Sequence, residues 1–210
     1  MYSVSQVTDI RELVRACELV IFDLDDTLYS EKAYVKSGYR KIANAFPQIE
    51  AMADRLWEAF LAGQQAINAV LQAEGLLNEQ NLKSCLEIYR NQTPDIELYD
   101  GVLELLNGLK ADGKRLALIT DGRSEGQRAK IRALGIENVF DSVIITDELG
   151  GIEYRKPCEK AFVLTVEGLG VPYEKSVYVG DNVNKDFVAP NKLGMQSILV
   201  KNQDGLYYQG

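Results

Sequence analysis

Five short apolar runs recur along the chain and determine its predicted architecture. The runs are almost continuous rather than alternating, which is typical of strands that are buried on both faces of a sheet. From the second run onward they alternate with segments of helical periodicity, and this repeat predicts an α/β fold whose parallel sheet carries helices on both faces. The expected strands are residues 19–22, 116–119, 143–145, 177–179 and 198–200.

A few residues indicate where the helices between these strands begin and end. Asp100 precedes a leucine-rich helical stretch and is expected to be its N-cap. Ser124 and Gln127 have the spacing of a capping box, and Gly135 is expected to end that helix. Pro190 is expected to kink or break a helix near the end of the chain.

The long segment after the first strand shows only helical periodicity. Met52, Leu56 and Phe60 recur every four residues within it. The segment is far too long for a strand-to-helix loop, which typically has about 2–6 residues. We therefore expect two domains, a catalytic core made of residues 1–28 and 94–210, and an inserted all-helical cap over residues 29–93.

Composition excludes several classes of partner. The 210 residues carry a formal net charge of −8 and the sequence pI is about 4.8, which argues against nucleic acid and anionic membranes. The sequence contains neither a long apolar span nor a signal-peptide pattern, and its three cysteines are scattered. We therefore expect a cytoplasmic protein with reduced cysteines.

The chain contains no histidine, so mechanisms that need a histidine base, nucleophile or metal ligand are excluded. The expected chemistry must instead come from carboxylates, hydroxyls, lysines and a metal ion. The stretch "DLDDT" places Asp23, Asp25 and Asp26 directly after the first strand. Like charges this close repel one another, and a bound cation would offset that cost. Of the three, Asp26 is expected to be solvated.

Other polar residues follow the later strands. In an open parallel sheet, ligands bind outside the carboxyl ends of the strands, so these residues are expected to converge on one crevice. A hydroxyl, a helix N-terminus and a lysine suit an anion, and carboxylates suit Mg²⁺. A cation beside an anion pocket describes the surroundings of a phosphate ester, which a carboxylate can attack as nucleophile. The residues concerned are Thr120, Asp121, Gly122, Lys156, Asp181 and Asp186.

As an ordered set, these motifs resemble the haloacid dehalogenase superfamily, on its phosphatase side. The matching elements are "DLDDT", the strand that ends at Thr120, Lys156, and "GDNVNKD". The resemblance covers essentially the whole chain, and an insertion directly after the first motif is similar to the helical-cap subclass of the family. It implies a Rossmann-like core with an all-helical cap.

The resemblance also implies roles for individual residues. Asp23 matches the nucleophile, and Asp25 matches the acid that protonates the leaving alcohol and then activates water. Thr120 matches the hydroxyl that holds a phosphoryl oxygen, and Lys156 matches the lysine that neutralises nucleophile and phosphate. The phosphate pocket is expected to include Asp121 and Gly122 as well.

For the metal, the resemblance implies that Asp23, Asp181 and the backbone carbonyl of Asp25 bind Mg²⁺. Asp186 matches an outer acid that orients Lys156 or metal-bound water. One position departs from the family pattern, because Asp121 stands where many members have Asn. Its extra negative charge would weaken anion binding unless the side chain points away.

In the cap, four residues near its start are weaker candidates for substrate contacts. Packing within the cap, with a solvated basic face, is the favoured alternative for each of them. These residues are Tyr34, Lys36, Tyr39 and Arg40.

The predicted function is a Mg²⁺-dependent phosphomonoester hydrolase that forms an aspartyl phosphate. Its substrate is expected to be a small phosphorylated metabolite, either a sugar phosphate or a nucleoside monophosphate. The alternatives are a phosphosugar mutase, a haloacid dehalogenase and a catalytically idle binding or regulatory module on the same fold. Asp25 counts against the dehalogenase, Thr27 counts modestly against the mutase, and the complete motif set counts against the idle module. The sequence leaves the oligomeric state open.

Overall fold

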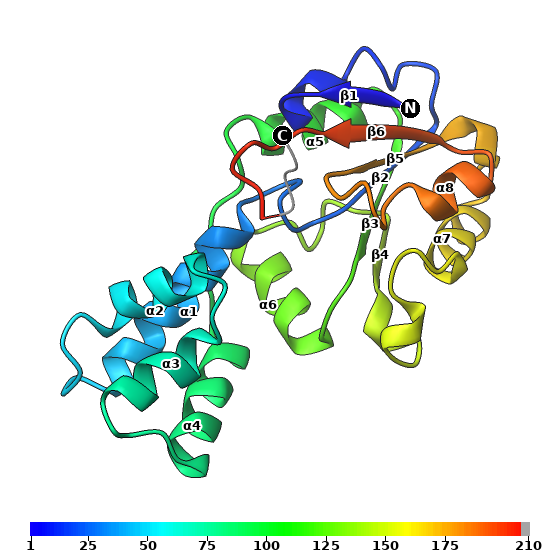
Figure 1. Cartoon of the computed structure of the whole chain (residues 1–210). Helices are drawn as coiled ribbons and strands as arrows, with labels where there is room; N and C mark the ends of the chain where they lie inside the picture. The colour runs from blue at the N-terminus through cyan, green and yellow to red at the C-terminus, as the bar shows by residue number, and fades with distance from the viewer. Residues whose placement is uncertain (207–210) are drawn as a thin grey trace. The chain divides into compact units, whose positions relative to one another are not determined.

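The core of the protein is a sheet of six parallel strands in the order β1-β6-β5-β2-β3-β4 (Figure 1). The computed structural model describes residues 1–206. The strands are β1 Tyr2–Val4, β2 Leu19–Phe22, β3 Arg115–Thr120, β4 Ser142–Ile145, β5 Ser176–Gly180 and β6 Gln196–Val200. The α/β fold class predicted from the sequence is confirmed.

The five predicted strands are all present, whereas β1 was not predicted. β1 has three residues, and Tyr2 and Ser3 are exposed. Its backbone pairs with β6, with Tyr2 opposite Ile198 and Val4 opposite Val200. Because it is short and lies at the edge of the sheet, it has no buried apolar run to mark it.

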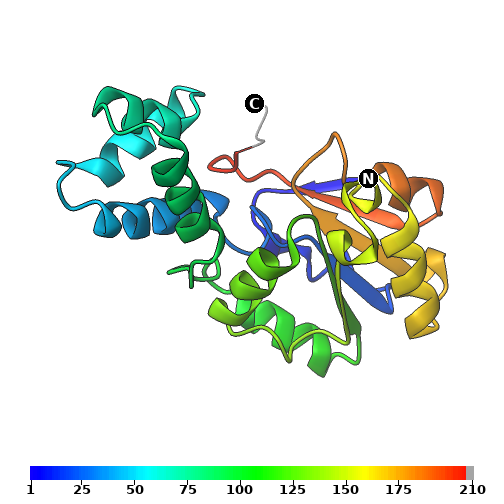
Figure 2. The same ribbon diagram turned by 90° about the horizontal axis from the view of Figure 1, so that it is seen from below.

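Helices cover both faces of the sheet (Figure 2). Helices α7 and α8 lie on one face, where Ile21, Ile119 and Tyr178 from the central strands pack against Phe162 and Ala189. Helices α5 and α6 lie on the other face. This two-sided burial accounts for the almost continuous apolar character of the strands. The core helices are α5 Val102–Ala111, α6 Ser124–Ala133, α7 Lys160–Leu169 and α8 Val188–Lys192, with short 3₁₀ turns at Val7–Ile10, Thr146–Leu149, Ile152–Tyr154 and Tyr173–Lys175.

Some predicted helix ends differ from the structure. Gly101, with a φ of 77°, is the N-cap of α5 in place of Asp100. The expected capping box of α6 is wrong, since Arg123 is the N-cap and no side chain caps the helix. Pro190 neither kinks nor breaks a longer helix, because it lies in the first turn of the five-residue α8, where its missing N–H costs little. Gly135 does follow α6, with a φ of 68°.

The chain divides into two compact units. One consists of Met1–Glu31 and the chain from Glu97 onward, and the other is Lys32–Ile96. The second unit is helical and has a core of its own that includes Ile42, Leu56 and Leu71. Its helices are α1 Glu31–Ala45, α2 Met52–Leu61, α3 Ala66–Ala73 and α4 Glu79–Arg90.

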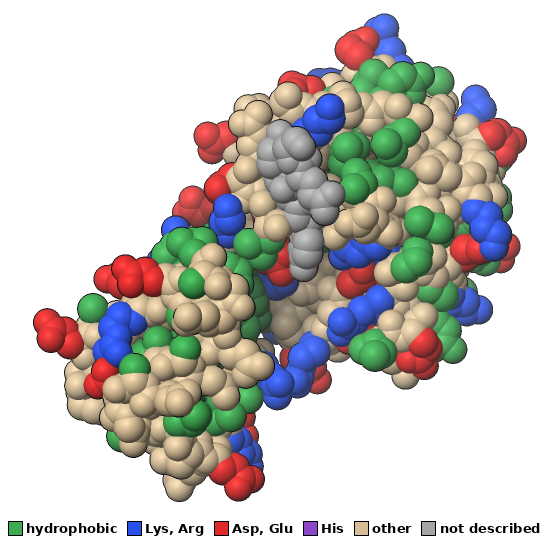
Figure 3. Space-filling model, in the orientation of Figure 1, with side chains coloured by type: hydrophobic (Ala, Val, Ile, Leu, Met, Phe, Trp, Pro, Cys, Tyr) green, Lys and Arg blue, Asp and Glu red, His purple; other side chains and the backbone are tan. Residues whose placement is uncertain are grey.

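The surface of the protein carries charges of both signs, and its cysteines are unpaired among the described residues. On the face shown in Figure 3, acidic and basic side chains are interspersed. Cys17 and Cys85 are buried, Cys158 is half-buried, and all three are free thiols. Within residues 1–206, the helices are too short or too polar to cross a membrane.

Candidate active site

Asp23 and Lys156 form a buried ion pair at the carboxyl end of the sheet. Asp23 directly follows β2, its side chain is 4% exposed, and its Oδ1 lies 2.8 Å from the Lys156 Nζ. The same ammonium lies 2.8 Å from Asp186 Oδ1 and donates to the Tyr178 hydroxyl at 2.8 Å. Burial disfavours the charge of Lys156, but Asp186 and Asp23 outweigh this and raise its pKa well above the usual value. Lys156 is therefore a fixed positive charge beside Asp23.

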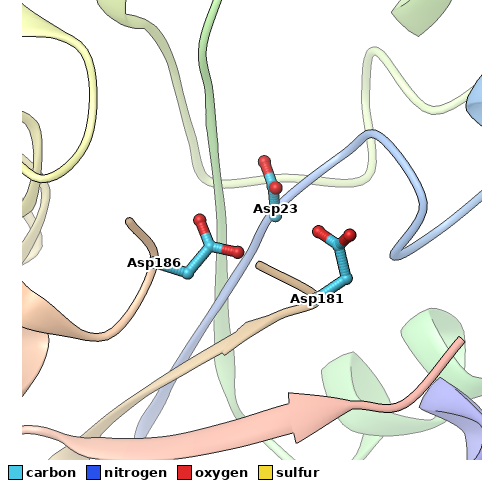
Figure 4. Close-up of side chains that lie close together, drawn as sticks. All are labelled: Asp23, Asp181 and Asp186. Atoms are coloured by element: carbon cyan, nitrogen blue, oxygen red, sulfur yellow. The ribbon is translucent and has the colours of Figure 1, made fainter. Parts of the chain in front are cut away.

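Three carboxylates meet next to this lysine. Asp23, Asp181 and Asp186 each place an oxygen within 4.8 Å of the others, and Figure 4 shows the three side chains close together, Asp23 from the end of β2, Asp181 from the end of β5 and Asp186 from the loop that follows β5. Burial raises the pKa of Asp23 to about 6, with a smaller upward contribution from Asp186 that Lys156 opposes. Burial and the charge of Asp23 raise the pKa of Asp181 to about 8. We refer to these three residues as the acidic corner.

The local backbone allows the acidic corner to be this compact. A Cβ at Gly180 would lie 2.5 Å from Asp186 Oδ2, so a side chain at the end of β5 would have to displace the Asp186 carboxylate. Asp186 Oδ2 accepts the Asn182 backbone N–H at 2.8 Å, which fixes the loop between Asp181 and Asp186.

The acidic corner fits a hard divalent cation. Its donors are all carboxylate oxygens, which Mg²⁺ prefers. Three carboxylates against the single ammonium of Lys156 leave a formal charge of −2 when all are ionised, which one Mg²⁺ would balance. Expected ligands Asp23 and Asp181 are both in the corner, and Asp186 is there too, although the sequence indicated only an outer role for it.

Asp25 is directed into a different environment, between β2 and helix α6. Its Oδ1 accepts from the Tyr29 hydroxyl and lies 2.6 Å from the Lys130 Nζ, and its Oδ2 accepts from Gln127 Nε2 at 2.9 Å. Burial alone would raise the pKa of Asp25, but Lys130, Tyr29 and Gln127 together hold it below its ordinary value. We call Tyr29, Gln127 and Lys130 the Asp25 cradle. These three residues were not predicted from the sequence to belong to the site.

The residues that were expected to bind an anion differ in their contacts. Thr120 is fully buried, and its hydroxyl accepts from Gln127. Asp121 Oδ1 accepts the Lys156 backbone N–H and the Thr146 hydroxyl, both at 3.0 Å, and its Oδ2 lies 3.2 Å from the Lys185 Nζ. The extra charge of Asp121 is therefore met by three donors. Gly122 has a φ of 130°, which favours glycine.

A cavity of about 330 Å³ lies within the core unit and is lined by Asp23 and Asp181 of the acidic corner together with Asp25, Asp121 and Lys156. Its position outside the ends of the strands is where an open parallel sheet binds its ligand. Three of its residues, Glu31, Arg155 and Lys185, were not predicted. Burial and the charge of Asp25 raise the pKa of Glu31 to about 8. The lining residues are Asp23, Asp25, Glu31, Asp121, Arg155, Lys156, Asp181 and Lys185.

Asp26 is buried, so the expectation that it is solvated is wrong. It is 1% exposed and has a φ of 53°. Its Oδ1 accepts the backbone N–H of Glu31 at 2.9 Å, and its Oδ2 accepts that of Leu206 at 2.7 Å. Asp26 therefore links the turn after β2 to the first residue of α1 and to the chain beyond β6.

In the helical unit, the four candidate substrate residues make local contacts. Tyr39 is buried in the core of that unit, and Tyr34 packs edge-on against Tyr89 with ring centroids 5.8 Å apart. The Lys36 Nζ lies 4.5 Å from the centroid of the Trp57 ring. Arg40 lies 3.1 Å from Asp95. These contacts fit packing within the unit, and the substrate role of the four residues stays a prediction.

Comparison with known proteins gives a consistent result. The profile of the haloacid dehalogenase-like hydrolases matches residues 20–200. A glyceraldehyde 3-phosphate phosphatase from Methanopyrus kandleri is 28% identical over 196 residues, covering 87% of this chain and 83% of the relative. A pyrimidine 5'-nucleotidase from Escherichia coli is 26% identical over 198 residues, covering 84% and 82%.

Solved structures show the same similarity. The crystal structure of a predicted phosphoglycolate phosphatase from Haemophilus somnus 129pt superposes with a TM-score of 0.61 at 25% identity, covering 88% of this chain and 85% of the other. The chain therefore belongs to the haloacid dehalogenase-like hydrolases, and its similarity to phosphatases agrees with the enzyme class predicted from its sequence.

Proposed function

We propose that the protein is a Mg²⁺-dependent phosphomonoester hydrolase that is transiently phosphorylated on Asp23. One observation carries the proposal. Asp23 lies at the cavity, held 2.8 Å from Lys156 and within a cluster of carboxylates suited to a divalent cation. A carboxylate beside a fixed ammonium is available as a nucleophile towards a phosphoryl group.

The first half-reaction transfers the phosphoryl group to the protein. An oxygen of Asp23 forms a bond to phosphorus while the bond to the ester oxygen breaks, and Asp25 supplies a proton to the departing alkoxide. Lys156 neutralises charge on the nucleophile and the phosphoryl oxygens. When bound, Mg²⁺ would supply further charge neutralisation, with Asp23, Asp181 and the Asp25 carbonyl as expected ligands and Asp186 close by.

The second half-reaction regenerates Asp23. Asp25, now charged, accepts a proton from water as its oxygen attacks the phosphorus of the acyl phosphate. The bond between phosphorus and Asp23 breaks, and inorganic phosphate leaves. The Asp25 cradle favours the charged carboxylate, which suits this base role. For the acid role, Asp25 must exchange a cradle contact for the leaving oxygen.

The substrate is proposed to be a small phosphorylated metabolite, either a sugar phosphate or a nucleoside monophosphate. Relatives that cover most of the chain include a glyceraldehyde 3-phosphate phosphatase and a pyrimidine 5'-nucleotidase, so both classes belong in the screen. We propose that the helical unit Lys32–Ile96 is the cap that selects among them.

The test is a hydrolysis screen of phosphorylated metabolites, with phosphate release measured in Mg²⁺ and in excess chelator. We expect Mg²⁺-dependent release from at least one small phosphate ester, and no release by Asp23→Asn on that ester. Hydrolysis that persists unchanged in Asp23→Asn would contradict the proposed nucleophile. Full activity after thorough chelation would contradict the metal requirement.

A further inference from the structure

Lys185 is a basic residue of the cavity that neither the motif comparison nor the proposed mechanism uses. It lies in the loop between β5 and α8, and its side chain is 30% exposed. Its Nζ lies 3.2 Å from Asp121 Oδ2, at the end of β3. Both residues line the cavity that contains Asp23 and Lys156.

The other two basic residues of the cavity are more heavily engaged. Lys156 is fully buried between Asp23 and Asp186, at 2.8 Å from each. Arg155 makes a two-pronged contact with Asp147, with both nitrogen–oxygen distances at 2.7 Å. Lys185 shows a longer contact to one carboxylate and retains solvent exposure. Since an ammonium has three donors, Lys185 can keep Asp121 and still reach an anion in the cavity.

The contacts of Asp121 suit it to position the Lys185 side chain. Its Oδ1 accepts two neutral donors, the Lys156 backbone N–H and the Thr146 hydroxyl, while Oδ2 faces Lys185. The carboxylate is therefore fixed on one side and presents its other oxygen to the ammonium. Without Lys185, the same charge would remain at the cavity wall, where it would repel a phosphate dianion.

From this arrangement we propose that Asp121 and Lys185 form an anion-binding pair, in which Asp121 positions Lys185 and Lys185 contacts the phosphoryl group of the substrate. The inference rests on the proposed function, because it names a further residue that binds the same phosphate. It also accounts for an acidic residue where many members of the family have Asn. At this position the negative charge of Asp121 holds the ammonium of Lys185 at the phosphate pocket.

The experiment is a double-mutant cycle with inorganic phosphate as the probe. Isothermal titration calorimetry in Mg²⁺ measures phosphate affinity for wild type, Asp121→Asn, Lys185→Met and the double variant. Kinetics on a small aryl phosphate give kcat and KM for the same four proteins. Lys185→Met is expected to weaken phosphate binding by about 10- to 100-fold, because a charge-assisted contact is lost and Asp121 is left uncompensated.

The double variant separates two contributions. If Lys185 binds phosphate, removing Asp121 as well restores only the part due to repulsion, and affinity stays at least about threefold below wild type. Full restoration to wild-type affinity would mean that Lys185 only neutralises Asp121, and this would overturn the proposal. Unchanged phosphate affinity and KM in Lys185→Met would overturn it equally.

Two further variants serve as controls for the charge and for the position of Lys185. Lys185→Arg keeps the charge and is expected to remain within about threefold of wild type, whereas a loss as large as that of Lys185→Met would overturn the proposed charge contact. Lys192→Met removes an exposed lysine that pairs with Glu159 outside the cavity, and it is expected to bind phosphate normally. If wild type neither binds phosphate nor hydrolyses any ester, the proposed function and this inference both fall. If wild type does both and Lys185→Met matches it, only the inference falls.

Discussion

Asp23 and Asp25 are separated by one residue, yet their carboxylates lie in opposite electrostatic surroundings. Asp23 belongs to the acidic corner, where burial and neighbouring carboxylates raise the pKa values of Asp23 to about 6 and of Asp181 to about 8. Asp25 lies in a cradle with its own ammonium from Lys130, and its pKa is lowered although burial opposes this. The acidic corner sets three carboxylates against the one ammonium of Lys156, whereas in the cradle the ammonium of Lys130 faces the carboxylate of Asp25.

This difference separates the proposed roles more clearly than the motif does. Environments that push the pKa values of two carboxyls apart are typical of active sites in which the two groups have different catalytic roles. The acidic corner suits a nucleophile that acts beside a bound cation, because without the cation its carboxylates carry more negative charge than Lys156 balances. The cradle suits a residue whose proton is exchanged with the substrate and water. The variants below test this division, beginning with the largest expected effect.

The most severe loss is expected from Asp23→Asn. An amide does not attack phosphorus, so turnover should fall below detection on every ester, activated or not. The substitution keeps the shape of the side chain, and Lys156 keeps its 2.8 Å contact with Asp186. A thermal melt should therefore show a folded protein. Residual turnover near the wild-type rate would show that the corner does not hold the nucleophile.

Asp25→Ala should separate the two half-reactions. Turnover of an ester with an alkoxide leaving group should fall by about 10²–10⁴-fold, because that step needs the acid. An activated aryl phosphate needs little protonation and should still phosphorylate Asp23. Without the base, the acyl phosphate should then accumulate, and rapid-quench kinetics should show a burst of aryl alcohol about stoichiometric with enzyme. Equal losses on both esters with no burst would mean that the cradle holds a structural carboxylate.

The corner and the cradle also differ in how far they could be predicted. Asp23 and Asp181 directly follow β2 and β5, and Asp186 lies in the loop after β5, so adjacent parallel strands would bring the three together at one edge of the sheet. The cradle residues Gln127 and Lys130 lie on helix α6, beyond the loop that follows β3, and belong to none of the strand-end motifs. They were missed for that reason.

A signal for the cradle was nevertheless present in the sequence. Gln127, Lys130 and Ile131 are the buried residues of α6, at the spacing of one helical face. Two polar side chains on a face that should be apolar indicate buried partners. The Gln127 side chain was instead assigned to a capping box, since local spacing alone cannot show that Asp25 and Thr120 would attract it.

Lys130→Met tests the cradle itself, with a smaller expected loss. Lys130 lowers the pKa of Asp25, so its removal lets burial raise that pKa. The charged form of Asp25 would then appear only at higher pH, and the acidic limb of the pH–rate profile should move upward. Turnover of an alkyl phosphate near neutral pH should fall by about tenfold.

Two matched variants test whether the shift of the acidic limb depends on the charge of Lys130. Lys130→Arg should keep the limb close to its wild-type position. Arg132→Met removes an exposed cation from the same helix and should leave the profile unchanged. An acidic limb that stays in place in Lys130→Met, despite reduced turnover, would show that Lys130 only supports packing.

The smallest effect is expected in the stability of the acidic corner, and its sign follows from the raised pKa values. Without metal, the folded protein retains protons on Asp181 up to a pH of about 8 and on Asp23 up to about 6, whereas both carboxyls have ordinary values near 3.8 when unfolded. The native state then binds more protons than the unfolded chain, so its stability falls as pH rises from about 4, to about 6 through Asp23 and to about 8 through Asp181. Mg²⁺ competes with these protons, so its stabilising effect should grow across the same window.

Thermal melts at pH 5, 6, 7 and 8, with saturating Mg²⁺ or with chelator, measure how much Mg²⁺ stabilises the protein at each pH. Asp181→Asn should flatten its rise above pH 6, while Asp112→Asn, which alters an exposed carboxylate paired with Arg11, should not. A Mg²⁺-induced shift that is constant from pH 5 to 8 would show that the corner does not bind the metal through these carboxylates.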